Sequence, residues 1–381
     1  MKKRILFGAV SLAMACALFA GCSKGAGEAN SNEIKIGMIT PLTGPVATFG
    51  VSAKEGAQLA VKEINDKGGI NGKKIKLVVE DDEADQTKSV NAYNTLVDNE
   101  KVVAMLGPVT SGATLAVVPN ATQNKMPLLT PTATEPNVTK VGGEYTFRAC
   151  YLDSYQGETL AKYAKEINKK NAAVLYNVGS DYSKGIAESF KKQFESDGGK
   201  VTEFLTYNDK DKDFNAQLTK IKNSNPDTIL LPDYYNVSAL IAKNARDLGI
   251  NATLLGVDGW ESEDLIKLGG DAVNNSYYIN HFFSEDQDAK VKTFVDSYKK
   301  EYNKTPDALA ALGYDGAKIM IKAIEKANST DGEKIKEALK STELDGVTGK
   351  ITFNADRNAV KGSVIIKVDG GKKTLAKKIN P

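Results

Sequence analysis

The chain has 381 residues, of which 26% are charged and 41% hydrophobic, and its 50 basic and 48 acidic residues leave a net charge of +2. This balance is typical of a soluble globular protein and excludes disordered, collagen-like and membrane-embedded chains. The near-neutral charge argues against nucleic acid as a partner, because phosphate binding needs a basic face. At about 150 residues per domain, the length predicts two domains.

Histidine and cysteine are scarce, which narrows the chemistry further. His281 is the single histidine, so two-histidine metal sites are excluded. The cysteines are Cys16, Cys22 and Cys150, and the first two fall in or beside an N-terminal leader. Cys150 would then be the only thiol of the folded body, which excludes an internal disulfide, thiolate zinc sites and iron–sulfur clusters. We therefore expect no metal and no cofactor.

The N-terminus has the pattern of an export signal. Residues 1–4 are basic, and residues 5–20 form an uncharged apolar run that is shorter than the roughly 20 residues of a membrane span. Phe19-Ala20-Gly21-Cys22 resembles the lipobox of bacterial lipoproteins, with Phe19 where leucine is usual. The resemblance implies a signal peptide over 1–21, lipidation of Cys22, a flexible linker over 22–32, and anchoring at the outer face of the cell membrane. An ordinary secretory signal with an incidental cysteine is the alternative.

From residue 33 onward, short β-branched runs alternate with amphipathic segments. The first part of this alternation predicts strands over 34–40, 74–80, 102–106 and 126–129, with helices over 51–67, 88–99 and 114–122. After a break near 145–153, the second predicts strands over 172–178, 201–205, 228–231 and 253–257, with helices over 182–195, 214–223 and 238–248. The tail predicts helices over 289–302, 307–327 and 334–339, then a hairpin-like pair over 350–353 and 363–368. The alternation predicts an α/β fold with two doubly wound parallel-sheet lobes.

Ligands of open parallel sheets bind beyond the carboxyl ends of the strands, so the residues that follow each strand are the candidates for a site. Ser111 follows the strand over 102–106 and opens a helix, where a hydroxyl and free N–H groups can hold a carboxylate. A simple helix cap is the alternative. Thr132 and Thr134 stand in a loop between two prolines, which turn chemistry explains equally well.

An acid and several aromatic residues stand at the same kind of junction. Asp258, before Gly259 and the only tryptophan, could pair with a ligand ammonium, although Asp-Gly is also a common turn. Phe49, Tyr182 and Tyr234 recur at strand-to-helix junctions of both halves. That recurrence favours a shared pocket over isolated core or surface positions.

These junctions carry a family resemblance. The chain resembles the leucine/isoleucine/valine-type substrate-binding proteins of ABC importers, which have the type I periplasmic binding fold. The matching segments run from residue 34 almost to the C-terminus: Pro41-Leu42-Thr43-Gly44-Pro45, Lys67-Gly68-Gly69-Ile70-Asn71-Gly72, Asp81-Asp82, Gly107 with Ser111, Thr130-Pro131-Thr132-Ala133-Thr134, Asp258-Gly259-Trp260 and Gly313-Tyr314-Asp315-Gly316.

The resemblance implies a role for each candidate. Ser111, Thr132 and Thr134 would bind the carboxylate of an amino acid, and Asp258 would hold its ammonium. The leucine-type receptors have glutamate at the position of Asp258, so the shorter acid implies a shifted ligand, a bridging water or a different ligand. Rings matching Phe49, Tyr182 and Tyr234 would wall the pocket. Leu309 is the candidate for the aliphatic subsite.

The resemblance also implies three crossovers between the lobes. The first lobe would take residues 33–148 and 283–342, and the second 149–282 and 343–381. A zwitterion would bridge the cleft, so that ligand shifts the open–closed equilibrium toward the closed form. An ABC permease would read that form, and we expect the receptor to be a monomer.

Three alternatives remain at this point. The same fold could receive another small solute, such as an amide, urea or an aromatic acid. An enzyme would have to use Asp81-Asp82 or Asp258 with a tyrosine, and the composition disfavours it. A sensory ligand-binding module is the third, which the lack of an attached signalling domain disfavours. Cys150 and His281 are expected to be structural.

Overall fold

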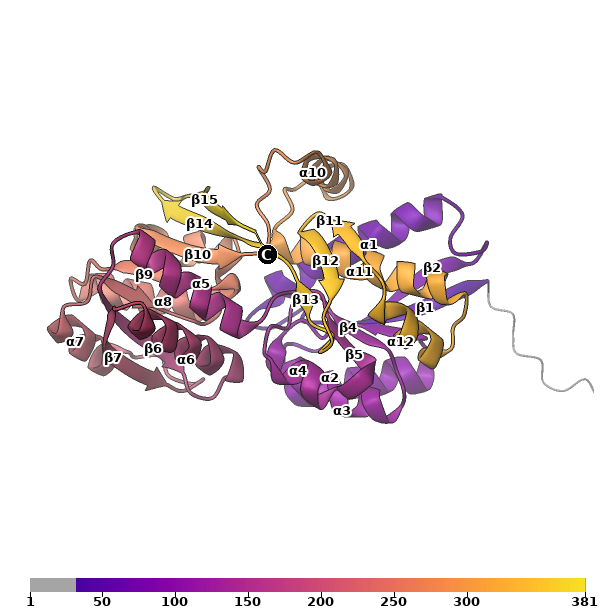
Figure 1. Ribbon diagram of the computed structural model, residues 1–381, viewed down its shortest axis with the longest axis horizontal. Coiled ribbons are helices and arrows are strands. Elements are labelled where there is room, and N and C mark those ends of the chain that lie inside the picture. Colours follow the sequence, from indigo (N-terminus) through magenta and orange to yellow (C-terminus); the bar gives the residue numbers. More distant parts are fainter. Residues whose placement is uncertain (1–31, 381) are drawn as a thin grey trace, which may run out of the picture. The chain divides into compact units, whose positions relative to one another are not determined.

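The computed structural model describes residues 32–380, and the predicted signal peptide, Cys22 and almost all of the predicted linker lie outside them (Figure 1). The elements that we call the first lobe surround a parallel sheet of order β2-β1-β3-β4-β5. Its strands are β1 (Glu33–Thr40), β2 (Lys74–Asp81), β3 (Ala104–Leu106), β4 (Leu128–Thr130) and β5 (Thr146–Arg148). Its helices are α1 (Ala47–Asp66), α2 (Gln86–Asn94) with a π-helical turn (Thr95–Asn99), α3 (Ser111–Gln123), α4 (Asn137–Val141), α10 (Ala289–Tyr302), α11 (Ala308–Ala327) and α12 (Gly332–Lys340).

The second lobe surrounds a seven-stranded sheet of order β15-β14-β10-β9-β8-β6-β7. Its strands are β6 (Asn171–Asn177), β7 (Lys200–Tyr207), β8 (Thr228–Leu230), β9 (Thr253–Gly256), β10 (Ser276–Asn280), β14 (Ser363–Asp369) and β15 (Lys372–Ile379). Its helices are α5 (Asp153–Glu166), α6 (Asp181–Ser196), α7 (Asn215–Ser224), α8 (Tyr235–Asp247) and α9 (Asp264–Gly269), with short 3-10 turns at Asp258–Trp260 and Gly270–Val273. Strands β6 to β10 are parallel, and β14 is antiparallel to both of its neighbours.

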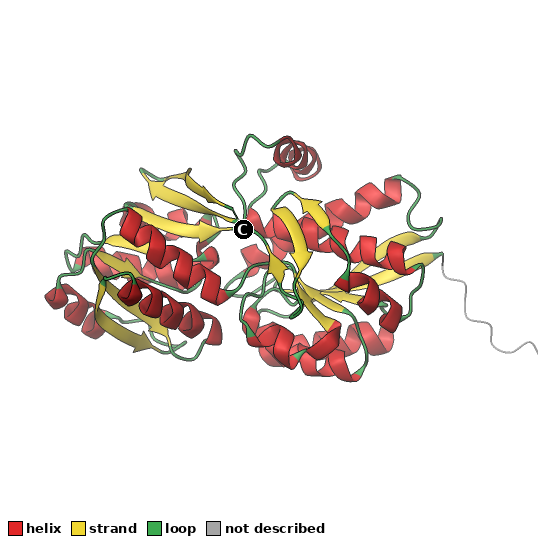
Figure 2. Cartoon of the chain, viewed as in Figure 1, coloured by secondary structure: helices red, strands yellow, loops and turns green. Residues whose placement is uncertain are grey.

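Burial explains why short apolar runs became the central strands. Helices cover the sheets (Figure 2), and every residue of β3, β4, β8 and β9 is buried. Sheets covered in this way need apolar side chains pointing in both directions, which is what an uninterrupted hydrophobic run supplies. The predicted α/β fold with two parallel-sheet lobes is confirmed.

The predicted pairing of 350–353 with 363–368 is wrong. The first segment is β12 (Gly349–Phe353), which pairs with β11 (Leu344–Gly346) and β13 (Ala359–Val360) in a separate small sheet. The second segment is β14, which pairs with β10 and β15. Each strand pairs instead with a strand next to it in the sequence. For β14 this strand is β15, because Gly370 and Gly371, with positive φ values of 54° and 70°, form the turn that joins the two.

The third crossover lies later in the chain than residue 343. The segment 343–360 contacts the first lobe: Lys322 Nζ donates to Glu343 O (2.7 Å), the rings of Phe147 and Phe353 lie 5.3 Å apart, and Arg148 Nε donates to Asn358 Oδ1 (2.8 Å). Strand β14 of the second lobe then begins at Ser363. These contacts put the crossover at Lys361 and Gly362, whereas the other two follow β5 and β10.

The helix α11 matters for the site because it carries apolar residues to it. It packs along α1, and a Cβ at Gly56 would lie 1.8 Å from Ala310 O. The close approach therefore needs glycine at this position. Asp307 fixes the beginning of α11, since its Oδ1 accepts a hydrogen bond from Ala310 N (2.8 Å).

Candidate functional site

One cavity collects every ligand-binding residue that the sequence predicts. It contains about 410 Å³ of space not occupied by atoms, part of which is open to solvent. Its lining includes the predicted Phe49, Ser111, Thr132, Thr134, Tyr182, Tyr234 and Asp258, and also Val109, Thr110, Gly259, Asn280, His281, Ala308, Leu309 and Leu312. Both lobes contribute to it.

The first-lobe wall contains the N-terminus of α3. The helix begins at Ser111, three residues before the predicted start, and its first internal hydrogen bond runs from Thr114 N to Thr110 O (2.9 Å). The N–H groups that precede Thr114 have no partner within the helix, so they can receive an anion. The Ser111 hydroxyl accepts a long hydrogen bond from Glu135 N (3.4 Å).

The threonine loop after β4 lies beside this helix end. Thr132 Oγ1 donates to Val109 O (2.5 Å), which ties the loop to the segment before α3. Thr134 is almost fully buried, and its carbonyl accepts a hydrogen bond from Asp153 N (3.0 Å) at the first residue of α5. The loop thus links the N-terminal end of α3 to the first crossover.

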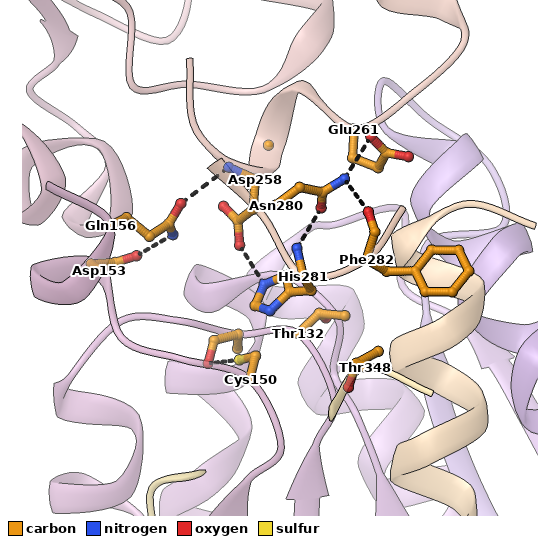
Figure 3. A network of polar contacts seen from close by, with 12 residues as sticks. Thr132, Cys150, Asp153, Gln156, Asp258, Glu261, Asn280, His281, Phe282 and Thr348 are labelled. Carbon is orange, nitrogen blue, oxygen red and sulfur yellow. Dashed lines mark hydrogen bonds and ion pairs between the residues drawn. The ribbon is translucent and has the colours of Figure 1, made fainter. Parts of the chain in front are cut away.

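The second-lobe wall presents a carboxylate. Asp258 follows β9, and only 13% of its side chain is exposed. Its Oδ1 accepts a hydrogen bond from Tyr182 Oη (2.6 Å), and its backbone N–H donates to Gln156 Oε1 (3.0 Å), as Figure 3 shows for the latter. Burial raises the pKa of Tyr182 well above its usual value, so the phenol keeps its proton and remains a donor.

Aromatic rings close the cavity from both lobes. Tyr182 and Tyr234 of the second lobe stack with their centroids 5.2 Å apart. Phe49, on α1 of the first lobe, meets Tyr234 edge to face at 5.5 Å. The stack therefore continues from one lobe to the other, and the N-terminal turns of α11 add the apolar side chains of Leu309 and Leu312.

Sequence reasoning missed His281 and Asn280 as lining residues. His281 directly follows β10, and its Nε2 lies 3.2 Å from Asp258 Oδ2 (Figure 3). Burial lowers the pKa of His281 to about 4, so the imidazole is neutral at neutral pH. The available signal was position: the single histidine stands just beyond a central strand, where the other site residues were sought.

The remaining polar candidates have structural partners. Asp81 Oδ1 accepts hydrogen bonds from the backbone N–H groups of Leu42 (2.8 Å) and Thr43 (3.4 Å), and Asp82 Oδ2 accepts one from Ser89 Oγ (2.9 Å). Cys150 is fully buried, and burial raises the pKa of its thiol to about 12. These residues are absent from the cavity lining. Within 32–380, no three His, Cys, Asp or Glu side chains gather to hold a metal ion.

The described part of the chain contains no helix that is both long and apolar enough to cross a membrane.

Comparison with known proteins identifies the fold and the family. A family model for periplasmic binding proteins matches residues 33–373. The Leu/Ile/Val-binding protein BraC3 of Rhizobium johnstonii is 36% identical over 329 residues, which cover 84% of this chain and 87% of that protein.

Two solved structures are similar throughout. The leucine-binding protein LivK of Thermotoga maritima has a TM-score of 0.86 and 36% identity, covering 91% of this chain and 99% of that one. The branched-chain amino acid transporter substrate-binding protein LivJ of Streptococcus pneumoniae, in complex with isoleucine, has a TM-score of 0.86 and 37% identity, covering 92% and 100%. The chain therefore belongs to the type I periplasmic binding protein family, in the branched-chain amino acid group of ABC transporter substrate-binding proteins.

Proposed function

We propose that the protein is the extracytoplasmic receptor of an ABC importer and binds a branched-chain or similar amino acid in the cavity between its lobes. One observation carries the proposal: a carboxylate on the second lobe and a helix N-terminus on the first lobe line the same cavity, together with apolar side chains. This arrangement suits a zwitterion with an aliphatic side chain. The similarity to LivJ, whose structure contains isoleucine, supports the same ligand class.

Each end of the ligand has its partner. The ligand ammonium binds Asp258, and the carboxylate binds the hydroxyls of Ser111, Thr132 and Thr134 with the free N–H groups at the start of α3. The aliphatic side chain lies against Leu309 and Leu312, and Phe49, Tyr182 and Tyr234 cover it. The positions of these side chains in one cavity support the assignment.

Closure follows from this division of contacts. The residues that bind the ligand carboxylate belong to the first lobe, and Asp258, which binds the ligand ammonium, belongs to the second. A zwitterion completes both sets of contacts only when the lobes are together, so it binds the closed form more tightly and shifts the equilibrium toward it. The closed form is the one that the permease receives.

The N-terminal pattern completes the proposal. Residues 1–21 direct export, and lipid on Cys22 holds the receptor at the outer face of the membrane beside its permease. The lipobox-like Phe19-Ala20-Gly21-Cys22 supports this. The chain acts as a monomer that binds its solute without converting it.

The test is a calorimetric titration of protein freed of bound ligand by unfolding and refolding. The panel contains leucine, isoleucine, valine, polar amino acids, simple amides, urea and benzoate. We expect saturable binding of the aliphatic amino acids at one site per chain. Binding of an amide or benzoate without any amino acid would contradict the proposal, because neither carries an ammonium for Asp258.

A further inference from the structure

The ammonium-binding carboxylate has a buried neighbour whose role the family assignment does not supply. His281 Nε2 lies 3.2 Å from Asp258 Oδ2, and only 2% of the histidine side chain is exposed. Tyr182 Oη occupies the other carboxylate oxygen at 2.6 Å. Each oxygen of Asp258 is thus held by one protein donor.

The imidazole is itself held in place by both of the first two crossovers. The backbone N–H of His281 donates to Asn280 Oδ1 (2.8 Å) (Figure 3). Asn280 Nδ2 in turn donates to Glu261 Oε2 (2.9 Å) and to Phe282 O (3.2 Å). The ring stacks on Tyr151, which lies in the first crossover, with centroids 3.6 Å apart and planes 16° apart. The stacking on Tyr151 and the hydrogen bond of the backbone N–H together fix the position of the His281 ring and of its Nε2 atom.

The hydrogen of the neutral ring belongs on Nε2. The other ring nitrogen, Nδ1, is buried and has no hydrogen-bond partner among the described residues. An orphaned buried N–H is rarer in proteins than an orphaned acceptor, so the tautomer with Nε2–H donating to Asp258 is the favourable one. This tautomer holds the carboxylate without bringing a positive charge to it.

A neutral histidine donor suits Asp258 better than a lysine or arginine side chain at the same place would. A permanent cation at this place would neutralise Asp258 and compete with the ligand ammonium. A neutral donor orients the carboxylate and leaves its charge available. A carboxylate has about four acceptor sites, so two held by Tyr182 and His281 leave room for an ammonium.

We propose that His281 is a positioning residue that orients the Asp258 carboxylate toward the ligand ammonium, and so makes the site selective for solutes that carry an amine. The inference rests on the proposed function. In this proposal, His281 also fixes the Asp258 side chain, which is one methylene shorter than a glutamate side chain. Its consequence is specific: loss of the Nε2 donor should weaken amine-bearing ligands and spare otherwise identical ligands without the amine.

The test compares leucine with 4-methylpentanoate, which has the same carboxylate and side chain and no amine. His281→Phe keeps a ring on Tyr151 and removes the donor, whereas His281→Gln keeps a donor near the position of Nε2. We expect His281→Phe to weaken leucine at least tenfold while 4-methylpentanoate changes less than twofold, and His281→Gln to recover most of the loss. His281→Asn, whose amide is too short to reach, replaces the phenylalanine variant if that one does not fold.

Tyr155→Phe is the matched control, since it removes a hydrogen bond to Ser363 Oγ (3.0 Å) near the same crossovers without touching Asp258. It should leave the ratio of the two affinities unchanged. Equal weakening of both ligands by His281→Phe, or leucine binding within twofold of the wild type, would overturn the inference. A wild type that binds no amino acid would contradict the proposed function first, and the inference with it.

Discussion

At the scale of single residues, the site depends on which acidic side chain faces the cavity. Asp258 retains partial exposure to the cavity, with 13% of its side chain accessible, whereas nearby Asp153 is fully buried and burial raises its pKa well above the usual value. Arg148, also fully buried, donates from Nε to Asn358 Oδ1 and from Nη1 to Ala133 O. Asp258 is the acidic residue of the cavity lining, and we therefore expect it to meet the ligand ammonium.

Asp258→Asn should weaken amino acid binding by about 30-fold or more, because removing one partner of a desolvated charge pair costs about 2 kcal/mol or more. Calorimetric titration with leucine measures the change. Asp247→Asn, at the exposed end of α8 in the same lobe, is the control and should leave the affinity unchanged. Wild-type affinity in Asp258→Asn would contradict the role of this acid.

The buried imidazole also predicts a pH dependence of stability. Burial lowers the pKa of His281 from 6.5 to about 4, and the groups that act on it are Asp258, Lys361 and Glu261, with Tyr151 stacked on its ring. Between these pH values the unfolded chain binds the proton and the folded chain does not. The contribution of the neutral histidine is thus complete above pH 6.5 and is lost as the pH falls toward 4.

Wild type should therefore lose about 2 kcal/mol more than His281→Gln between pH 7 and pH 4.5. Urea unfolding at a series of pH values measures both proteins. Buried acids with raised pKa values, such as Glu135 and Asp307, act in the opposite direction but are common to both proteins, so they cancel in the difference. Parallel pH profiles would show that His281 does not titrate in this window.

At this scale the sequence was informative where the family motif names the residue. Ser111, Thr132, Thr134 and Asp258 follow central strands, and the parallel sheets bring those strand ends to one cavity. His281 could not be assigned in the same way. Its place beside Asp258 depends on how β9 and β10 pair and on the stacking of Tyr151, neither of which leaves a local pattern in the sequence.

At the scale of elements, periodicity found most strands and helices of the two lobes, but it missed the helix α5 and the strands β5, β10 and β15. The predicted helix over 289–302 has the observed bounds of α10, because Asp288 accepts a hydrogen bond from Lys290 N at its start and left-handed Asn303 follows its end. The tail was harder. Strands β12 and β14 have similar patterns, and only their tertiary partners, the small sheet and β10, distinguish them.

The packing of α1 on α11 gives an element-scale prediction. A Cβ at Gly56 would lie 1.8 Å from the backbone oxygen of Ala310, so Gly56→Ala forces the helices apart. We expect a loss of about 1–3 kcal/mol of unfolding free energy, as in other overpacked cores. Because α11 carries Leu309 and Leu312 to the cavity, ligand affinity should fall as well.

Gly185→Ala is the matched substitution in α6. Its Cβ would lie 3.7 Å from Asp153 Cβ, an ordinary contact, so the higher helix propensity of alanine should leave stability unchanged or raise it by up to about 1 kcal/mol. Urea unfolding of both variants separates packing from propensity. A Gly56→Ala protein as stable as Gly185→Ala would contradict the close approach of α1 and α11.

At the scale of the whole molecule, direct hydrogen bonds join the lobes beside the cavity. Tyr235 Oη, on α8, accepts from Thr48 Oγ1 (3.0 Å) and donates to Pro45 O (3.2 Å). Ser262 Oγ donates to the same threonine hydroxyl (3.3 Å). Hydrogen bonds between the lobes favour keeping them together, so we expect these contacts to slow the release of ligand.

Tyr235→Phe should speed ligand dissociation about fivefold, since a neutral hydrogen bond contributes about 1 kcal/mol. Stopped-flow displacement measures the rate. Tyr302→Phe is the control, because Tyr302 Oη donates to Glu55 O (2.9 Å) within the first lobe. Its dissociation rate should match the wild type, and an unchanged rate in Tyr235→Phe would show that these interlobe bonds do not hold the closed form.

We propose that a zwitterion bridges the two lobes with its ends in opposite walls of one cavity. A crystal structure of the protein with leucine tests it most directly. We expect the leucine nitrogen within about 3.2 Å of an Asp258 carboxylate oxygen, and the leucine carboxylate at Ser111 and the start of α3. A ligand bound in the reverse orientation, or outside this cavity, would contradict it.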